Sequence, residues 1–433
     1  MRAKITVDIN DLHPSGNGIA HDPQFGHIYV PFTFPGERLD VTLREEIRPG
    51  KWHADRVALP AAHCSHAGRC GGCVWPGAPY AEQLTWKKTL LLRAARAIPQ
   101  LASLPVNLHA APQVSGFRNR VHLHANFFQG DLEFGFYGRG SRALVAIEDC
   151  PVAEAPLREV MSALAGVKKG GWPASENFGF GIELIHLREE NSKIMMILYA
   201  SPLRKATLAE AIPRFAALDP NLLVREAFRS QEDVFVWQRL PGATMYTKPG
   251  VFQQGNTAQS DTIRGLIAAE ISARRPDVVF DLYCGSGNYS LPLHGLVGRV
   301  FGCDDNPLSI TMAQFNAGRN GITNTAYVCG DAANVLQRRK DLGWPEQADL
   351  VIVDPARYGM SAAVIGELGQ MRPPRLFYIS NHRESFIRDA RQLLAAGFKP
   401  EKLELVDFFP HTPHLDIVSI WTHSGSSAGP NSV

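Results

Sequence analysis

The chain has 433 residues, of which 45% are hydrophobic and 20% charged, and its 44 Lys and Arg against 42 Asp and Glu leave a net charge of +2. This length and composition predict a globular protein of two or three domains. There is no apolar run of about 18 residues, and the N-terminal segment MRAKITVDIN has no apolar signal core, so neither a membrane span nor secretion is indicated. We therefore expect a cytoplasmic protein.

Residues 1–58 carry short β-like runs, such as 27–30 and 38–43, which are interrupted by glycines and prolines. The pattern predicts a small OB-like β-barrel. Such barrels bind single-stranded nucleic acid through aromatic and basic side chains. The candidates for that role in this segment are Phe32, Phe34, Arg38, Arg44, Arg48, Lys51, Trp52 and Arg56.

Seven cysteines are present, and four of them form a metal-like pattern. Cys64, Cys70 and Cys73 are spaced C-x5-C-x2-C, and Cys150 is a distant fourth thiol. Thiolates at this spacing can enclose a compact metal centre, and four thiolates also suit a structural zinc. The pattern favours metal-binding thiols in a reducing compartment over disulfide-bonded cysteines. The remaining cysteines lie on or just after apolar runs and are predicted to be small core residues, namely Cys284, Cys303 and Cys329.

The pattern of helix and strand signals changes twice after the predicted barrel. A helix-like stretch at 80–97 and mixed strand signals predict a central α+β domain over 59–245. From residue 246 to 433, helical segments alternate with short apolar runs at 278–280, 300–301, 350–353 and 376–379. Alternation of this kind is typical of an α/β domain with a doubly wound, Rossmann-like sheet.

The first of these apolar runs leads into a glycine turn with Gly285 and Gly287. Glycines there let the backbone approach a ligand, and Asp304, about 20 residues further on, can accept hydrogen bonds from ribose hydroxyls. Two further acids, Asp331 and Asp354, are expected at strand ends. The absence of a full GxGxxG favours S-adenosylmethionine over a dinucleotide.

These motifs resemble those of the S-adenosylmethionine-dependent RNA uracil-5 methyltransferases, most closely the branch that acts on large-subunit ribosomal RNA. The likeness covers nearly the whole chain, including the segments 73–75, 80–84, 117–120 and 135–137. It implies a TRAM-type barrel, a central domain with a [4Fe-4S] cluster on the four cysteines, and a class I methyltransferase domain. The family's cofactor contacts fall on Gln254, Tyr283, Asn288, Asp304, Asp331 and Asp354.

The resemblance also implies a ribosomal RNA partner for a chain that we expect to be monomeric and not bound to membranes. Phosphates are expected to meet arginines of the central region, namely Arg118, Arg120, Arg139 and Arg142. Access to a base in folded RNA requires that the base be flipped out of its stack.

Two chemical positions depart from the family's pattern. Methylation of carbon 5 of uracil needs a thiolate that adds at carbon 6, because carbon 5 is a poor nucleophile. The family's nucleophilic cysteine falls on Asn381, and a carboxamide cannot perform that addition. The family's basic glutamate falls on Asp416, which keeps the carboxylate on a side chain shorter by one methylene.

Three interpretations follow from these departures. The favoured one is an RNA methyltransferase whose target is a ring nitrogen or exocyclic heteroatom, with Asp354, Asp416 or His382 as the base. The second keeps 5-methyluridine formation with a displaced nucleophile. The third is an inactive RNA-binding or ribosome-assembly factor that retains the cofactor fold, in which Asn381 is a loop residue that bonds the backbone.

Overall fold

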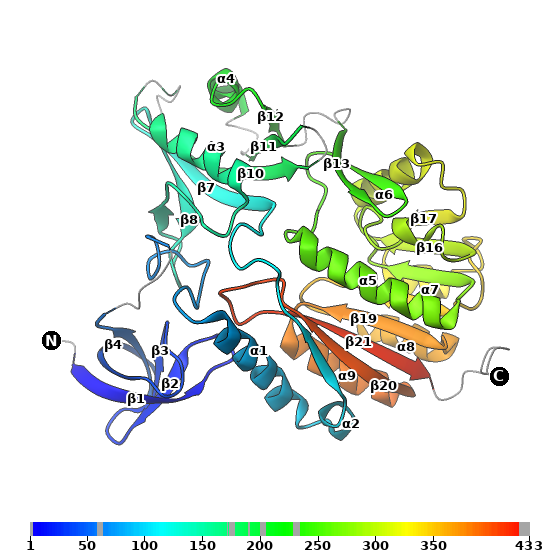
Figure 1. The fold of residues 1–433 in the computed structure, drawn as a ribbon, viewed down its shortest axis with the longest axis horizontal. Coiled ribbons are helices and arrows are strands. Elements are labelled where there is room, and N and C mark those ends of the chain that lie inside the picture. Colours follow the sequence, from blue (N-terminus) through cyan, green and yellow to red (C-terminus); the bar gives the residue numbers. More distant parts are fainter. Residues whose placement is uncertain are drawn as a thin grey trace.

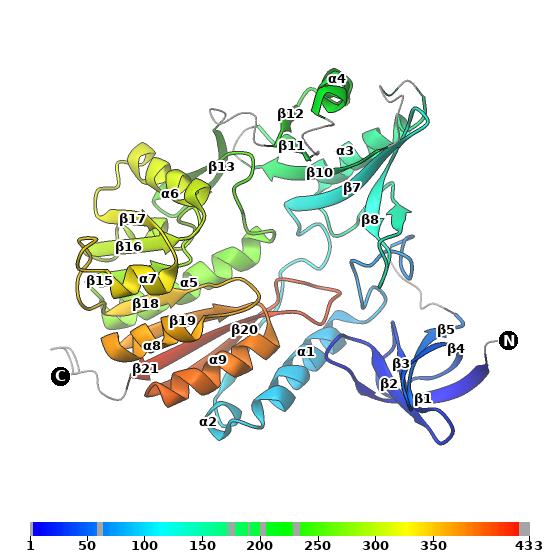
Figure 2. The ribbon, with the colours of Figure 1, turned by 180° about the vertical axis from the view of Figure 1, so that it is seen from behind.

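The computed structural model describes residues 3–58, 64–170, 172, 178–188, 191–199, 205–227 and 234–423. These residues form a barrel, a central sheet and a larger C-terminal sheet (Figures 1 and 2). Within this part of the chain, no helix is both long and apolar enough to cross a membrane.

The N-terminal barrel confirms the predicted β-barrel. It closes in the order β1-β2-β3-β5-β4, where the strands are β1 (Lys4–Leu12), β2 (Gly18–Asp22), β3 (Gly26–Val30), β4 (Arg38–Arg48) and β5 (Lys51–Arg56). Alternate residues point inward, as the two-residue period of a strand requires, and Val7, Ile9, Ile28, Val41 and Leu43 form its core.

The central sheet has the order β12-β11-β10-β7-β8-β9. Its strands are β7 (Arg120–Phe128), β8 (Asp131–Tyr137), β9 (Leu144–Ala146), β10 (Phe178–Leu187), β11 (Lys193–Tyr199) and β12 (Leu222–Glu226). Helices α3 (Ala155–Gly166) and α4 (Lys205–Ala216) bury their apolar residues against one face. On the opposite face, Ile185, Met195 and Ile197 are buried in a second apolar cluster.

The C-terminal sheet has the order β17-β16-β15-β18-β19-β21-β20-β6. The strands from β17 to β19 are parallel, and β21 runs antiparallel to both of its neighbours. They are β6 (Val106–His109), β15 (Val278–Leu282), β16 (Arg299–Asp304), β17 (Thr325–Cys329), β18 (Leu350–Val353), β19 (Arg375–Ser380), β20 (Phe398–Val406) and β21 (Asp416–His423). The apolar runs expected to form parallel strands do so.

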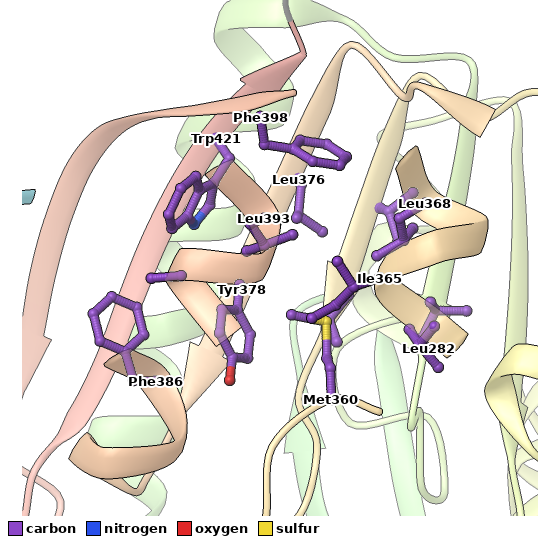
Figure 3. Close-up of a cluster of buried hydrophobic side chains, with 14 of the residues drawn as sticks. Leu282, Met360, Ile365, Leu368, Leu376, Tyr378, Phe386, Leu393, Phe398 and Trp421 are labelled. Carbon is purple, nitrogen blue, oxygen red and sulfur yellow. The ribbon is translucent and has the colours of Figure 1, made fainter. Parts of the chain in front are cut away.

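Helices pack on both faces of this sheet. One face is covered by α1 (Tyr80–Ala95), α2 (Pro99–Ala102), α7 (Ala332–Gln337), α8 (Ala362–Met371) and α9 (Arg383–Ala395). Figure 3 shows part of this core, where Tyr378, Phe386 and Trp421 lie between the sheet and α9. The other face carries α5 (Thr257–Arg274) and the short η2 (Leu291–Leu293), while α6 (Pro307–Arg319) packs beside Tyr327.

A hairpin of β13 (Phe235–Leu240) and β14 (Ala243–Thr247) connects the two sheets. Its Trp237 and Met245 are fully buried between Ile185 and Met195 of the central sheet and Ile310 of α6. This shared apolar cluster links the central sheet to the C-terminal one.

The segment 80–109 belongs structurally to the C-terminal sheet, although it lies within the range expected for the central domain. Helix α1 begins at Tyr80, as predicted, and places Leu91 and Ala95 in the core of the C-terminal sheet. Strand β6 then extends that sheet by pairing parallel to β20. The chain therefore enters the C-terminal sheet once before it builds the central one.

One prediction about the cysteines is wrong. Cys284 and Cys303 are buried, as expected, but Cys329 is exposed. The reason is that β17 is the edge strand of the sheet, so the end of this strand has no neighbour on its outer side.

Candidate active site

The turn after β15 is the centre of the expected cofactor site. Gly285 and Gly287 have φ values of 56° and 92°, which favour glycine, and Tyr283 adopts a φ of 63° although it has a side chain. A Cβ at Gly287 would lie 2.8 Å from Cγ of Leu291, whereas one at Gly285 would meet no atom within 4 Å. The turn thus packs on one side and faces open space on the other.

Asp304, at the end of β16, braces this turn. Its Oδ2 accepts a hydrogen bond from the Gly285 amide at 3.0 Å, and its Oδ1 accepts one from the Asn306 amide at 2.9 Å. Burial raises the pKa of Asp304 in spite of these bonds. The structure therefore places Asp304 and the glycine turn together, as predicted.

Asp331 follows β17 and is exposed, with a local role that the sequence analysis did not assign. Its Oδ1 accepts hydrogen bonds from the amides of Ala333 and Asn334, both at 3.1 Å, so it is the N-cap of α7. It also raises the pKa of Tyr283, although burial contributes more to that shift. Asp331 and Tyr283 therefore lie at the same edge of the sheet.

Asn288 is held by helix α5. Its Oδ1 accepts a hydrogen bond from Nη1 of Arg264 at 2.7 Å, and its Nδ2 donates to Oγ of Ser260 at 3.3 Å. Arg264 is only 7% exposed and also bonds Asp261 at 2.5 Å. The sequence analysis missed Arg264. It could have been noticed as a charged residue next to the apolar stripe of this helix.

Gln254 lies where the central sheet meets α5. Nδ2 of Asn119 donates to the Gln254 carbonyl oxygen at 2.9 Å and to Oγ1 of Thr257 at 2.7 Å. Arg120 of β7 also donates to the carbonyl of Gln253 at 3.3 Å. The central sheet therefore fixes the backbone of the segment that was expected to contact the cofactor.

Three carboxyl groups gather at the C-terminal ends of the parallel strands. Asp281 of β15 is fully buried, and burial raises its pKa to about 7. Asp354 follows β18, and its pKa is also raised to about 7. Burial is the larger cause, and the nearby Asp281 is the smaller one. The pKa of Asp416 lies well above its ordinary value because of burial first and Asp354 second. All three groups therefore hold protons more tightly than ordinary carboxyls do.

Asn381 follows β19 directly and Asp416 begins β21, so the two residues lie at the same end of this strand pair. The last paired residues of these antiparallel strands are Ser380 and Ile417, so Asn381 and Asp416 occupy the next opposite positions. Directly opposite residues point to the same face, with Cβ atoms about 5 Å apart. The Oδ1 atoms of Asn381 and Asp416 are both buried and have no hydrogen-bond partner.

His382, a candidate base, has a structural role instead. It is the N-cap of α9, where its Nδ1 accepts a hydrogen bond from the Ser385 amide at 3.4 Å and lies 2.9 Å from the Ser385 hydroxyl. Its Nε2 lies 3.3 Å from the Glu384 carboxylate. With both ring nitrogens engaged, His382 is a weaker candidate than Asp354 or Asp416.

A pocket of about 290 Å³ lies against Asn381. Basic side chains surround it, and the pKa of His414 is lowered to about 4 by burial first and then by Arg357, Lys87 and Arg383. The cationic groups have acidic partners, however, because Lys87 pairs with Asp407 and Arg383 with Glu384. The pocket is lined by His13, Pro14, Ser15, Lys87, Leu91, Asn381, His382, Arg383, Glu384, Pro413, His414, Leu415 and Ile417.

The four cysteines of the predicted metal centre come together from two distant segments. All four are partly buried and reduced, and the other three raise the pKa of Cys73, although burial contributes more. The Gly72 amide donates to Sγ of Cys70 at 3.4 Å. Across the part of the chain that the structure describes, no three ligating side chains are close enough to hold a single metal ion.

The open face of the central sheet carries a row of aromatic and basic side chains that the sequence analysis largely missed. We call it the aromatic face, and its members are Arg120, His122, His124, Tyr137, Tyr199 and Phe252. His124 stacks on Tyr137 at 3.6 Å between ring centroids, and the guanidinium of Arg120 lies 5.3 Å from the ring centroid of Phe252. Tyr137 and Phe252 are 41% and 62% exposed. The two-residue period of β7 was the signal that could have revealed this row.

Several residues predicted to touch RNA are instead structural. Phe32 and Phe34 of the barrel are 6% and 7% exposed, and Phe34 packs 5.2 Å from Trp75. Arg139 lies over the Phe32 ring and also bonds Asn17. These aromatic side chains are buried because the barrel packs against the segment that follows Cys73.

Comparison with known proteins agrees with this arrangement. A family model described as tRNA (Uracil-5-)-methyltransferase matches residues 79–422. The chain is 30% identical over 453 positions to the uncharacterized RNA methyltransferase tlr0942 of Thermosynechococcus vestitus, covering 98% of each. It is 28% identical to the 23S rRNA (uracil(1939)-C(5))-methyltransferase RlmD of Pectobacterium atrosepticum, covering 97% of this chain and 94% of that protein.

A solved structure shares the fold. The tRNA (uracil-54, C5)-methyltransferase of Pyrococcus abyssi, in complex with S-adenosyl-L-homocysteine, superposes with a TM-score of 0.70 at 22% identity and covers 96% of this chain. Fold and site together define an S-adenosylmethionine-dependent RNA methyltransferase. The chain belongs to the tRNA (uracil-5-)-methyltransferase family.

Proposed function

We propose that this chain transfers the methyl group of S-adenosylmethionine to a base in RNA without a covalent bond between enzyme and base. The observation that carries the proposal is the pairing of Asn381 with Asp416. A carboxamide stands where the family's nucleophile falls, and the buried Asp416 carboxyl lies at the same end of the strand pair. Burial raises the pKa of Asp416, and the positive sulfonium of a bound donor would lower it again and so favour the ionised form that accepts a proton. Such a site can position a base and deprotonate it, but its Asn381 cannot add to a ring.

The residues around the glycine turn fit the methyl donor, which supplies an electrophilic methyl group when bound. We assign its binding to Gln254, Tyr283, Gly285, Gly287, Asn288, Asp304, Asp331 and Asp354. Support comes from the open space beside Gly285 and from the fixed positions of Asn288 and Gln254. Asp354 and Asp416 are the candidate proton acceptors.

RNA is the proposed substrate, and large-subunit ribosomal RNA, the substrate named for the RlmD relatives, is the first to test. The aromatic face offers rings on which successive bases of a single strand can stack. Arg120 connects that face to the segment around Gln254, so a strand on the face would lead toward the cofactor turn.

We also propose that Cys64, Cys70, Cys73 and Cys150 hold a [4Fe-4S] cluster with a structural role. The fit rests on four partly buried thiols from two segments and on the amide bond to Cys70. Burial raises the pKa of Cys73 and Cys150, and the nearby positive charge of Arg118 offsets part of that rise. Backbone amides of Val74 and Trp75 bond the His411 carbonyl at 2.9 and 2.8 Å, so this segment supports the loop that leads to Asp416.

The domain division that we propose follows these roles: a barrel over 1–58, a central cysteine-bearing unit over 59–245 and a methyltransferase unit over 246–433. Residues 80–109 are a part of the central range that the C-terminal sheet incorporates.

The test combines calorimetry with methyl transfer. We expect the full-length protein to bind S-adenosylmethionine and to transfer labelled methyl groups to ribosomal RNA from cells that lack the gene. RNA containing 5-fluorouridine should form no stable adduct, since that adduct needs an enzyme nucleophile. A trapped adduct would contradict the non-covalent mechanism. Retained RNA binding without any transfer would favour an inactive assembly factor.

A further inference from the structure

We infer that the methylated base carries an exocyclic amino group, as cytosine, adenine and guanine do, and that the methyl group is attached to that nitrogen. This inference rests on the proposed function and specifies its substrate. It follows from two buried oxygens without a partner, Oδ1 of Asn381 and Oδ1 of Asp416, whose residues occupy the next opposite positions beyond the Ser380–Ile417 pair of β19 and β21.

Both oxygens are hydrogen-bond acceptors when Asp416 is ionised, and the positive sulfonium of the bound donor would favour that form although burial raises the pKa of Asp416. A buried acceptor without a partner is costly, so the site strongly favours a ligand that donates to it. Asp416 is only 6% exposed, and its Oδ1 is shielded from water. A base has to be turned out of its stack and inserted to reach either oxygen.

An amino group matches this pair of acceptors because it offers two N–H donors from one nitrogen. One N–H can bond Asn381 and the other Asp416, which leaves the lone pair of the nitrogen directed away from both oxygens. Uracil matches poorly because its exocyclic groups are carbonyls, whose oxygens would face the two acceptors. Sites built to bond an N–H reject analogues that lack it by large factors.

The transfer step then balances without a thiol. The amino nitrogen attacks the donor's methyl carbon, so an N–C bond forms as the C–S bond breaks and S-adenosylhomocysteine leaves. One amino proton passes to the Asp416 carboxylate and from there to solvent. Asp416 would be a catalytic residue, and Asn381 would determine which base is accepted.

Nucleoside mass spectrometry tests the inference directly. Full-length protein, methyl-labelled S-adenosylmethionine and ribosomal or transfer RNA from cells without the gene should yield cytidine, adenosine or guanosine methylated on the exocyclic nitrogen. A 5-methyluridine or ring-nitrogen product would overturn this inference but leave the proposed methyltransferase function standing. No transfer to either RNA would overturn both.

Three variants then test the roles of the two oxygens. Asn381→Leu removes the acceptor at similar size and should lower kcat/KM about tenfold or more, while Asn381→Asp keeps an oxygen there and should restore most of the loss. Asp416→Asn cannot accept a proton and should lower kcat about 10²- to 10⁴-fold. Asn221→Leu, at an exposed position just before β12 of the central sheet, is the matched control and should leave kcat/KM unchanged.

Donor affinity separates this assignment from a role in binding S-adenosylmethionine. The calorimetric Kd of the donor should be unchanged in Asn381→Leu. If that Kd weakens by the same factor as kcat/KM falls, the Asn381 oxygen serves the donor, and the inference about the base is wrong.

Discussion

Nζ of Lys87 lies 2.5 Å from Oδ1 of Asp407, and both side chains are fully buried. The ammonium also donates to the Phe409 carbonyl at 2.9 Å, and the Tyr80 hydroxyl donates to Oδ2 of Asp407 at 2.8 Å. Helix α1 thereby holds the connection between β20 and β21. Because that connection ends at Asp416, a structural ion pair supports the position of a proposed catalytic group.

Replacing Lys87 should reveal the cost of an unpaired buried charge. We expect Lys87→Met to lower the free energy of unfolding by about 3–5 kcal/mol, because Asp407 would keep its burial and lose its cation. Urea denaturation measures the change. The control is Lys340→Met, whose ion pair with Glu346 is exposed and should contribute little to stability. If both variants lose the same free energy of unfolding, the buried ion pair stabilises the fold no more than the exposed one does.

The glycine turn should tolerate no side chain at position 287. Gly287→Ala places a Cβ 2.8 Å from Leu291 and strains a backbone with φ of 92°. A strain of about 1–2 kcal/mol from φ alone, together with that clash, should weaken S-adenosylmethionine binding by about tenfold or more in calorimetry. Gly295→Ala, where a Cβ meets no atom within 4 Å, should bind the donor normally.

The stability of the donor-free protein should depend on the protonation of Asp281. Its pKa is about 7 in the folded state, against an ordinary value of 3.8, so the folded protein binds more protons than the unfolded one between these values. The contribution of Asp281 to the free energy of unfolding is therefore fully present below pH 4 and is lost as the pH rises to 7. The total loss is at most about 4 kcal/mol.

The variant Asp281→Asn isolates this effect, because it cannot ionise. We expect the difference in unfolding free energy between variant and wild type to move in favour of the variant from pH 5 to pH 8. Asp341→Asn, whose side chain is 72% exposed, should show no such trend. If the unfolding free energies of wild type and Asp281→Asn depend on pH in the same way, the prediction that Asp281 is protonated in the folded protein is wrong.

The aromatic face should contribute to RNA affinity through stacking. We expect His122→Ala and Tyr137→Ala each to weaken RNA binding by about 1–3 kcal/mol, measured by fluorescence anisotropy, without changing the Kd of S-adenosylmethionine. The control is Phe315→Ala, which removes a 37%-exposed ring on α6. If all three variants weaken binding alike, the face has no specific role.

Metal content should distinguish the clustered thiols from the isolated ones. Cys73→Ser is expected to lower the iron content and the visible absorbance of anaerobically purified protein, because a ligand is removed. Cys329→Ser, at an exposed thiol on the edge strand, should keep both. Stoichiometric zinc in place of iron would support the alternative of a structural zinc site.

Much of the fold could be predicted from local sequence. Short apolar runs mark the buried parallel strands, and the glycines at 285 and 287 mark a turn whose positive φ values few other residues adopt readily. The predicted barrel is present as well. These features depend on residues close together in the chain, so their signals are local.

The sequence by itself therefore determined the element types, the family and the chemical departures at Asn381 and Asp416. Only the tertiary structure decided that Lys87 meets Asp407, that 80–109 joins the C-terminal sheet, and that the Asn381 and Asp416 oxygens are buried without partners. The physical reason is that strand pairing and burial join residues that are tens to hundreds of positions apart. No local periodicity records which of those distant residues become neighbours.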